Sequence, residues 1–429
     1  MTYQAPPGVF DIIPQDLKNP WKNSKAWAHV ECIMSELAKV YGYSEIRTPI
    51  FEKTDLFKRG VGEETDIVSK EMYTFQDRGD RSLTLRPEGT APVVRALIEN
   101  SLLAKRELKV FYLGPMFRYE RMQAGRFRQF NQFGIEAFGR AEPEQDAEVI
   151  ALSYEIFKKL GIKGLKVKLS SLGDLEARRR FKEDLVTFLK QHLEGLSEDS
   201  KRRVETNPLR VLDSKDEGDR KILKSAPSLH DHLSPESLAH FEKVQALLKA
   251  LNIPFEIDDC LVRGLDYYES TVFEIVSEDL GAQNALGGGG RYDGLLEQLG
   301  GERLPSIGFA LGVERTLQVM LKQGVLDTSP QGLELYLIPM GEEAVKKAFT
   351  LIHALREMGI ACDLRLAQSK VGKGFSRADE LGARYAAALG ERELESNTLE
   401  LKKLSSGEKT EVSFQELSTF LKITKENHV

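Results

Sequence analysis

The chain has 429 residues, more than one compact core usually holds, so we expect two or three domains. Apolar residues make up 41% of it and charged residues 29%, a balance typical of folded proteins in water and not of disordered chains. No stretch approaches the roughly 18 to 20 consecutive apolar residues of a membrane span, and the start of the chain lacks a signal-peptide pattern. These features exclude a membrane protein and predict a cytoplasmic one.

The cysteines and histidines indicate no metal or redox centre. Cys32, Cys260 and Cys362 lie far apart, which gives neither a disulfide framework nor zinc-ligand spacing. The His-Asp-His run at 230–232 has the composition of a metal site, but no third ligand is indicated nearby. No Ser/His/Asp or Cys/His set can be assembled either. We therefore expect no stored metal and no covalent nucleophile.

The net charge is −6, from 60 basic and 66 acidic residues, yet two stretches are locally basic. Residues 118–128 hold four arginines against one acid, and residues 365–377 hold four basic residues and no acid. Such stretches on an acidic protein fit a partner bound through a few phosphates. A pair of solvated surface loops would give the same pattern, so charge alone leaves both interpretations open.

The first part of the chain mixes helical and strand patterns. In chain order they predict a helix over 21–41, a bent strand over 43–57, a hairpin with its turn at 77–80, a helix from Thr90 and two strands within 109–138. Gly42 is expected to end the first helix, Pro49 to bend the strand, and Thr90 to cap the second helix.

One face of the two predicted strands is unusually polar. Arg118 and Glu120 share it on the first strand, and Gln132, Gly134 and Glu136 share it on the second. This is too polar for a core, so it is either solvated surface or a binding site. Because a glycine between polar residues leaves room for something to approach, the pattern favours a site.

The second part of the chain begins with a change of character. Residues 176–250 are helical and charge-rich, which indicates a module inserted into a sheet-based domain. Strand patterns return over 254–278 and 285–291, and a strand followed by a helix is expected over 306–321. From about residue 332, alternating strand and helix patterns predict a separate α/β domain.

Several charged residues stand where strands end. Arg86 and Glu88 lie where a strand meets a helix N-terminus, a place that favours anions and small polar ligands. Arg263 and Arg315 also stand near strand ends or strand-to-helix steps. Any one of these arginines could form a surface ion pair. Together they suggest a pocket for a zwitterion and a polyphosphate. The run Gly287–Gly290 matches no phosphate-loop motif and serves either ligand approach or a strand bend.

Five segments carry a resemblance to a known family. Residues 27–49, 117–136 and 308–315 (GFALGVER) resemble motifs 1, 2 and 3 of class II aminoacyl-tRNA synthetases. LVRGLDYY at 261–268 and ALGGGGRYDGL at 285–295 resemble the two histidine-specific signatures of bacterial histidyl-tRNA synthetases. The resemblance covers nearly the whole chain.

The resemblance implies an α+β fold, with an antiparallel sheet flanked by helices, a helical insertion and a C-terminal α/β anticodon-binding domain. The segments would be 1–175 and 251–325 for the two parts of the catalytic domain, 176–250 for the insertion and 332–429 for the anticodon-binding domain. It also implies a cytoplasmic homodimer that uses L-histidine, ATP with Mg²⁺, and tRNA(His). Histidine and ATP would give histidyl-adenylate and pyrophosphate, and the histidyl group would pass to the terminal adenosine of the tRNA.

The resemblance also assigns roles to residues. Glu88 and Thr90 would hold the amino-acid end, with Glu88 on the α-ammonium. Gln132, Glu136, Tyr267 and Tyr268 would line the histidine pocket, with Glu136 and Tyr268 at the imidazole. The ATP-binding residues would be Arg118 at the α-phosphate, Glu120 near the adenine, Arg126 at the phosphates or the acceptor end, and Arg315 at the γ-phosphate. Arg263 would act with Arg118 in catalysis, at the reacting carboxylate and α-phosphate.

Two alternatives remain beside the ligase. One is a regulatory paralogue that senses histidine and partners a histidine-biosynthesis transferase; the intact Arg118, Arg263 and Arg315 and the long C-terminal part favour the enzyme. The other is a class II synthetase for another amino acid, such as proline or threonine, against which the two histidine signatures argue. Asn131 stands where many relatives carry histidine, which touches the edge of the pocket.

Overall fold

The chain forms two units in the computed structural model, Met1–Leu326 and Asp327–Val429, and each is described by itself. The structure describes residues 3–62, 65–104, 107–120, 125–212, 214, 216–261, 264–277, 285–328, 332–366 and 370–426. Arg263 lies outside these described residues. None of the helices in the described ranges is both long enough and apolar enough to cross a membrane.

The first unit is built on an eight-stranded sheet in the order β1-β5-β6-β11-β10-β9-β7-β8. The strands are β1 Ser44–Glu45, β5 Leu108–Phe117, β6 Gln129–Phe138, β7 Leu165–Ser171, β8 Phe255–Ile257, β9 Glu269–Ser277, β10 Ala285–Arg291 and β11 Ser306–Gly312. The central pairs are antiparallel, and only the edge pairs β1–β5 and β7–β8 are parallel. This arrangement confirms the antiparallel α+β fold.

Both faces of the sheet are covered. On one face lie the helices α1 (Ser24–Val40), α4 (Pro143–Lys159), α8 (Pro235–Ala250) and α10 (Val313–Lys322), which share a core with Phe111, Phe133 and Phe309 of the strands. On the other face lie α3 (Thr90–Glu99), α5 (Leu175–Gln191) and α9 (Leu295–Gln298), around Tyr112 and the tyrosines of the strand ends. The second face holds the site described below.

Local sequence explains most of these elements. Trp27, Val30, Met34 and Ala38 recur at helical spacing along α1 and are all buried, and Gly42 follows the helix at φ +83°, which confirms the expected first helix and its stop. The hairpin expected around 77–80 is also present, with β3 (Thr74–Gln76) and β4 (Ser82–Leu85) paired in antiparallel register.

Two local expectations are wrong. The strand expected over 43–57 ends early, since β2 covers only Phe51–Lys53 and α2 begins at Thr54 and runs to Val61. Phe57 and Val61, one turn apart, are fully buried beside Ala91, and this tertiary packing favours a helix. Thr90 also does not cap α3: it is the first residue of that helix, and the Glu88 carboxylate accepts the N–H groups of Thr90 and Ala91.

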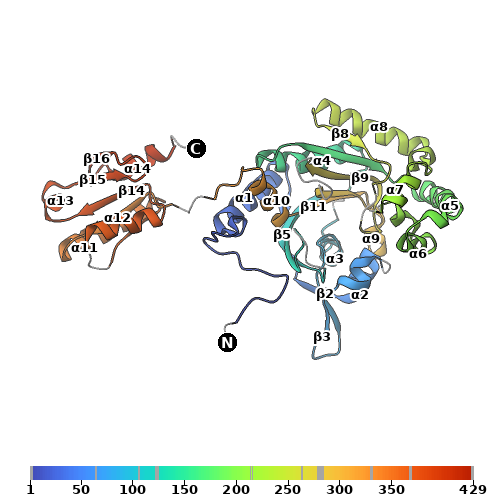
Figure 1. Cartoon of the computed structure of the whole chain (residues 1–429), viewed down its shortest axis with the longest axis horizontal. Coiled ribbons are helices and arrows are strands. Elements are labelled where there is room, and N and C mark those ends of the chain that lie inside the picture. Colours follow the sequence, from blue (N-terminus) through green and yellow to red (C-terminus); the bar gives the residue numbers. More distant parts are fainter. Residues whose placement is uncertain are drawn as a thin grey trace. The chain divides into compact units, whose positions relative to one another are not determined.

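The helical segment between β7 and β8 contains α5, α6 (Glu198–Thr206), α7 (Glu217–Leu223) and α8, with short 3-10 turns between them. Figure 1 shows these helices, coloured green to yellow, gathered beside the strands β8 and β9. Asp174, Ser197, Asp216 and Ser234 cap the four helices by accepting backbone N–H groups.

The second unit is a five-stranded mixed sheet in the order β13-β12-β14-β15-β16. Its strands are β12 Leu335–Pro339, β13 Cys362–Leu364, β14 Tyr385–Leu389, β15 Thr398–Lys403 and β16 Lys409–Ser413, and its helices are α11 Glu342–Glu357, α12 Val371–Glu380, α13 Glu391–Ser396 and α14 Leu417–Glu426. Buried residues of α11 and α14 pack on one face of the sheet, and α12 packs on the other through Ala378.

Candidate active site

The floor of the site is made by β5, β6, β10 and β11 and depends on glycines. Gly134 on β6 pairs with Tyr112 on β5, and a Cβ at Gly134 would overlap the Tyr112 ring. Gly308 on β11 pairs with Glu136 on β6, and a Cβ there would overlap the Glu136 carboxylate. The glycines therefore let a phenol and a carboxylate lie across neighbouring strands. Of the polar strand face that the sequence predicts, Gly134 and Glu136 are buried and Gln132 is half-buried, while Arg118 and Glu120 follow the end of β5 and are also half-buried. This burial favours a site over a plain solvated surface.

Glu136 lies at the centre of the site and is only 1% exposed. Thr90 Oγ1 donates a hydrogen bond to Glu136 Oε1 at 2.7 Å, and the Tyr292 hydroxyl donates to Oε2. Burial raises the pKa of Glu136 to about 8, and the two hydroxyl donors oppose that rise only in part. The carboxyl group is thus poised to gain or lose a proton near neutral pH.

Glu88 lies beside it at the N-terminus of α3 and is 2% exposed. Its Oε2 accepts from Thr90 N at 2.7 Å, and its Oε1 accepts from Ala91 N at 2.8 Å. Burial raises the pKa of Glu88, while these two N–H groups and Arg118 act in the opposite direction. A cation placed here would compensate the buried negative charge.

Aromatic side chains from the segments 261–268 and 285–295 close one side of the site. The rings of Tyr267 and Tyr268 have centroids 4.7 Å apart, and those of Tyr267 and Tyr292 are 5.6 Å apart. Burial raises the pKa of Tyr112, Tyr267 and Tyr292 well above the usual range, so all three stay protonated. The site is therefore a pocket lined by tyrosine rings, with the carboxyl group of Glu136 at its base.

Gln132 Oε1 and Glu314 Oε2 line the same cavity, and among the described residues neither of these buried oxygens has a hydrogen-bond partner. Buried polar atoms normally have hydrogen-bond partners, so two buried oxygens without one in a single cavity indicate a polar ligand. Gln132 lines a cavity of about 230 Å³ together with Phe130, Arg118 and Arg126.

The positive end of the site is formed by three arginines. Arg118, Arg126 and Arg315 line a cavity of about 720 Å³, which the carboxylates Glu71, Glu120 and Glu274 also line. Arg118 Nε donates to Pro87 O at 2.8 Å, and Arg126 Nη1 donates to Glu120 Oε2 at 2.9 Å. The Arg118 guanidinium lies 5.3 Å from the centre of the Phe130 ring.

Burial and the neighbouring Arg126 lower the pKa of Arg315, which indicates a cation held in a desolvated, positively charged wall. Glu314 beside it accepts from Asn131 N at 2.7 Å and from Asn131 Nδ2 at 3.1 Å, and burial raises its pKa to about 7. Asn131 thus belongs to the floor of the positive end.

The structure brings together all the described residues that the sequence singled out for this site: Glu88, Thr90, Arg118, Glu120, Arg126, Gln132, Glu136, Tyr267, Tyr268 and Arg315. Arg86 lies near them but serves the scaffold, since it donates to Pro115 O at 2.8 Å and to Thr48 O at 3.0 Å. The His-Asp-His run lies elsewhere: His232 Nε2 is 2.8 Å from Asp184 Oδ2, and the described ranges hold no group of three or more side chains arranged to bind a metal.

Sequence reasoning missed Tyr112 and Tyr292. Tyr292 stands inside the quoted glycine signature, directly after β10, and this position could have indicated it. Tyr112 shares the polar face of its predicted strand with Gly114 and Arg118 at a spacing of two, and this register could have indicated it.

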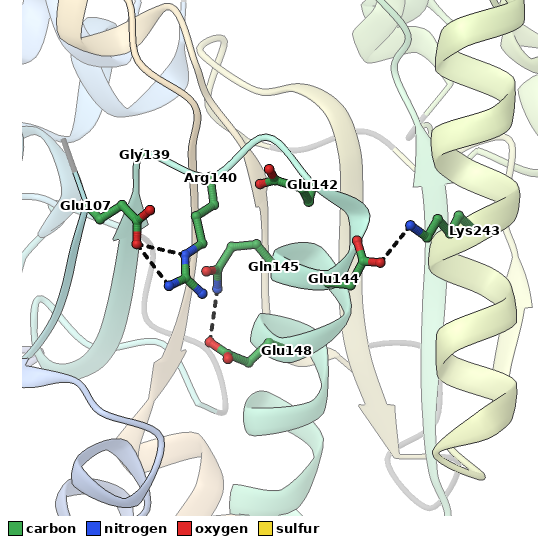
Figure 2. Close-up of a pocket in the computed structure, with 8 residues that line it drawn as sticks. All are labelled: Glu107, Gly139, Arg140, Glu142, Glu144, Gln145, Glu148 and Lys243. Atoms are coloured by element: carbon green, nitrogen blue, oxygen red, sulfur yellow. Dashed lines mark hydrogen bonds and ion pairs between the residues drawn. The ribbon is translucent and has the colours of Figure 1, made fainter.

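A second cleft, of about 470 Å³, lies at the loop between β6 and α4 (Figure 2). Figure 2 shows two ion pairs, Glu107 with Arg140 and Glu144 with Lys243, and a hydrogen bond from Gln145 to Glu148. The same loop receives Arg291, whose guanidinium donates to the carbonyl oxygens of Arg140 at 3.2 Å and Glu142 at 3.3 Å. The cleft is therefore part of the scaffold that holds the segment before Tyr292.

A helix-flanked antiparallel sheet with arginines at its strand ends and an acid-based pocket beside them defines a class II aminoacyl-tRNA synthetase. The family model for histidyl-tRNA synthetase matches residues 19–316, and the model for the anticodon binding domain matches residues 334–424. The chain belongs to the histidyl-tRNA synthetase family.

Individual relatives agree with this. The chain is 52% identical to the histidine–tRNA ligase of Protochlamydia amoebophila, over 98% of this chain and all of that one. It is 48% identical to that of Bacillus subtilis, over 100% of this chain and 99% of that one. The crystal structure of apo Staphylococcus aureus histidyl-tRNA synthetase matches with a TM-score of 0.80 at 40% identity, covering 98% of this chain and 100% of that one. These full-length matches to ligases favour the enzyme over a regulatory paralogue and over a synthetase for another amino acid.

Proposed function

We propose that this chain joins L-histidine to tRNA(His) in two steps in the cytoplasm. In the first, a carboxylate oxygen of histidine attacks the α-phosphorus of ATP, the bond to the bridging oxygen breaks, and histidyl-adenylate and pyrophosphate form. In the second, a hydroxyl of the terminal adenosine of the tRNA attacks the activated carbonyl carbon and AMP leaves. The observation that carries this proposal is the buried Glu136 at the base of a tyrosine-lined pocket.

Glu136 and Tyr268 are proposed to recognise the imidazole. A ring with two nitrogens needs an acceptor on one side and a polar partner on the other, and a carboxyl group with a phenol supplies both. An amino acid without such nitrogens would bury the polar groups that face the imidazole without making their hydrogen bonds, so it would be rejected strongly. Gln132, Thr90 and Tyr267 complete the wall of the same pocket.

Glu88 is proposed to hold the α-ammonium group of histidine. Its two oxygens already accept backbone N–H groups, but each oxygen has a further lone pair. The ammonium group would replace the water that burial removes, and the substrate carboxylate would then point toward Arg118.

The arginines are proposed to bind ATP. Arg118 would stabilise the charge on the α-phosphate in the transition state, and Arg315 would hold the γ-phosphate. Arg126, now paired with Glu120, would exchange that partner for the phosphates or the acceptor end, and Glu120 would be released toward the adenine. Both reacting groups, the carboxylate and the α-phosphate, are negatively charged, so positioning and charge stabilisation supply the catalysis. The role of Arg263 at the reacting carboxylate is proposed from the family resemblance alone.

Mg²⁺ is proposed as the partner of ATP. The cavity lined by Arg118, Arg126 and Arg315 also holds three carboxylates, Glu71, Glu120 and Glu274. The pKa of Glu71 is raised mainly by burial and to a smaller extent by the negative charge of Glu120. Carboxylate oxygens together with substrate phosphates are the ligands that Mg²⁺ prefers. When bound, the ion would neutralise phosphate charge; the residues around it orient the nucleotide.

The arrangement of segments is proposed to follow function. Residues 1–175 and 251–325 would form the catalytic domain, 176–250 the insertion and 332–429 the anticodon-binding domain. The insertion contributes Arg210, Arg220 and Lys224 to the wall of the large cavity, where they could meet the phosphates of the acceptor end.

A homodimer is proposed through the small sheet β2-β4-β3 and its surroundings. Ile50, Phe51 and Phe75 there are 45%, 47% and 43% exposed, and the two phenylalanine rings are 6.4 Å apart. A cluster of exposed large apolar side chains indicates a protein interface. Light scattering coupled to size-exclusion chromatography would give the mass of the species in solution.

ATP–pyrophosphate exchange with each of the twenty amino acids in the presence of Mg²⁺ tests the proposed activity. Exchange with histidine alone is expected, and it should fall to background in Glu136→Ala. Glu107→Ala is the matched control, because Glu107 pairs with Arg140 on the surface. Exchange with another amino acid, or undiminished exchange in Glu136→Ala, would contradict the assignment of the pocket.

A further inference from the structure

The inserted helices reach the histidine pocket through one arginine. Arg178, on the first turn of α5, donates a hydrogen bond from Nη1 to the carbonyl oxygen of Tyr268 at 2.8 Å. Two backbone bonds hold the same place: Leu172 N donates to Ser270 O at 2.6 Å, and Ser270 N donates to Gly173 O at 3.1 Å. The entry to the insertion is thus joined to the segment that carries Tyr267 and Tyr268.

Arg178 differs from the arginines that follow it. Arg179 is 58% exposed in its side chain and pairs with Glu176 and Glu183 at 2.7 Å, and the side chain of Arg180 is 50% exposed. Arg178 is instead partly buried; desolvation lowers its pKa, and the charges of Glu269 and Asp266 oppose that shift. Removing a guanidinium from water costs free energy, which hydrogen bonds must compensate. The bond to the Tyr268 carbonyl is therefore expected to be important for the position of Arg178.

The segment that Arg178 holds is conformationally demanding. Ser270 has φ +51°, a left-handed conformation that is unfavourable for a residue with a Cβ. Such a conformation persists only where the surroundings fix it. The backbone bonds with Leu172 and Gly173 fix Ser270 from the insertion side, and the Arg178 bond holds the carbonyl of Tyr268 two residues before it.

From this segment, contacts lead directly to Glu136. The Tyr268 ring packs on Tyr267, Tyr267 packs on Tyr292, and the Tyr292 hydroxyl donates to the Glu136 carboxylate. All three tyrosines are buried, so a shift of the Tyr268 backbone moves rings that have no free space.

We propose that Arg178 is a positioning residue of the histidine pocket and that it couples the inserted helices to occupancy of that pocket. The inference rests on the proposed function for the identity of the ligand, an imidazole-bearing amino acid. Loss of the Arg178 bond removes that donor from the Tyr268 carbonyl and weakens histidine binding, while the arginines that bind ATP keep their places. Coupling is reciprocal, so bound histidine must in turn stabilise α5.

Pyrophosphate exchange with Arg178→Ala, Arg178→Lys and Arg179→Ala tests the positioning role. Arg178→Ala should raise the KM for histidine roughly tenfold, the usual scale for a lost bond to a charged donor, and leave the KM for ATP within about twofold. Arg178→Lys keeps one charged donor and should recover part of the loss, and Arg179→Ala should match the parent. Equal changes in both KM values, or an unchanged KM for histidine in Arg178→Ala, would overturn the proposal.

Hydrogen exchange on the unchanged chain tests the coupling without any variant. Added L-histidine should slow exchange of the amides of α5 (Leu175–Gln191), and L-lysine at the same concentration should not. Unchanged exchange across α5 at saturating histidine would overturn the coupling even if Arg178→Ala fails to fold. If the parent chain activates no amino acid, the proposed function fails separately, and calorimetric titration of histidine into Arg178→Ala and Arg179→Ala still decides the role of Arg178.

Discussion

Arg291 Nη2 lies 2.5 Å from Asp146 Oδ1, with the arginine side chain 2% exposed and the aspartate fully buried. The other carboxylate oxygen, Oδ2, accepts from Thr271 Oγ1 at 2.6 Å and lies 2.8 Å from His240 Nε2. Asp146 therefore joins β10, β9 and the helices α4 and α8 at one buried point. The residue after Arg291 is Tyr292, which donates to Glu136, so this pair lies directly behind the pocket that holds Glu136.

Breaking this pair should destabilise the first unit strongly. Arg291→Met leaves Asp146 charged and buried without its cation, and removal of one partner of such a pair typically costs about 3 to 5 kcal/mol. The chain has two tryptophans, Trp21 and Trp27, and both belong to the first unit, so tryptophan emission during urea unfolding reports on that unit.

The matched control is the surface pair of Arg140 with Glu107, whose side chains are 49% and 58% exposed. Arg140→Met should change the free energy of unfolding by about 1 kcal/mol or less. The double variant Arg291→Met with Asp146→Leu should be more stable than Arg291→Met alone, because no charge is then buried unpaired. A double variant as unstable as the single one would show that packing and not charge explains the loss.

Histidine affinity should depend on pH through Glu136. The pKa of Glu136 in the chain without ligand is about 8, and that of the imidazole of free histidine is about 6.5. In the complex, Glu136 and the imidazole must share one titratable proton. Between these values no net proton moves on binding. Below about 6.5 a proton must leave, and above about 8 a proton must be taken up, so affinity falls on both sides.

Calorimetric titration of histidine from pH 5.5 to 9.5 measures this profile. Glu136→Gln cannot titrate, so it should bind histidine more weakly and lose the part of the alkaline fall that Glu136 causes. The parent chain without ligand should also lose stability as the pH rises from about 4.5 to about 8, because a raised pKa means that the folded state holds the extra proton. An identical alkaline fall in both proteins would place that titration on another group.

The fold class and most site residues could be predicted because they lie in short segments with strong local patterns. The α1 stripe of Trp27, Val30 and Met34 is visible in sequence as helical spacing, and the motif segments carry charged residues that have no place in a core. These signals need only neighbours in the chain.

The errors arise where distant packing decides. α2 begins at Thr54 because Phe57 and Val61 pack against Ala91. This contact joins residues about 30 positions apart, so the local sequence pattern does not predict it. Glu88 and not Thr90 caps α3, because the Glu88 carboxylate accepts the first two backbone N–H groups of that helix, those of Thr90 and Ala91. Tyr112 lies on β5 and Tyr292 directly follows β10, and only the pairing of β5, β6, β11 and β10 brings them to Glu136.

Removal of a catalytic arginine should abolish activation without unfolding the protein. Arg118→Ala and Arg263→Ala are expected to lower kcat for pyrophosphate exchange by a factor on the order of 100 or more, the usual effect of losing one preorganised group that stabilises developing charge. Arg81→Ala is the control, because Arg81 pairs with Asp77 in an exposed hairpin. Tryptophan emission should remain as in the parent for all three. Activity near the parent level in either active-site variant would remove that arginine from the catalytic step.

Truncation after Leu326 should separate the two steps of the reaction. The first unit contains every described residue proposed to bind histidine and ATP, so pyrophosphate exchange by residues 1–326 should stay within about tenfold of the full chain. The unit that begins at Asp327 matches the anticodon-binding family model over 334–424, so its loss should weaken charging of tRNA(His) far more than activation. Comparing the two assays on the same preparation controls for misfolding, because a misfolded first unit would lose both activities. Full charging by the truncated chain would show that the first unit alone recognises the tRNA, with the insertion cations Arg210, Arg220 and Lys224 as the next candidates.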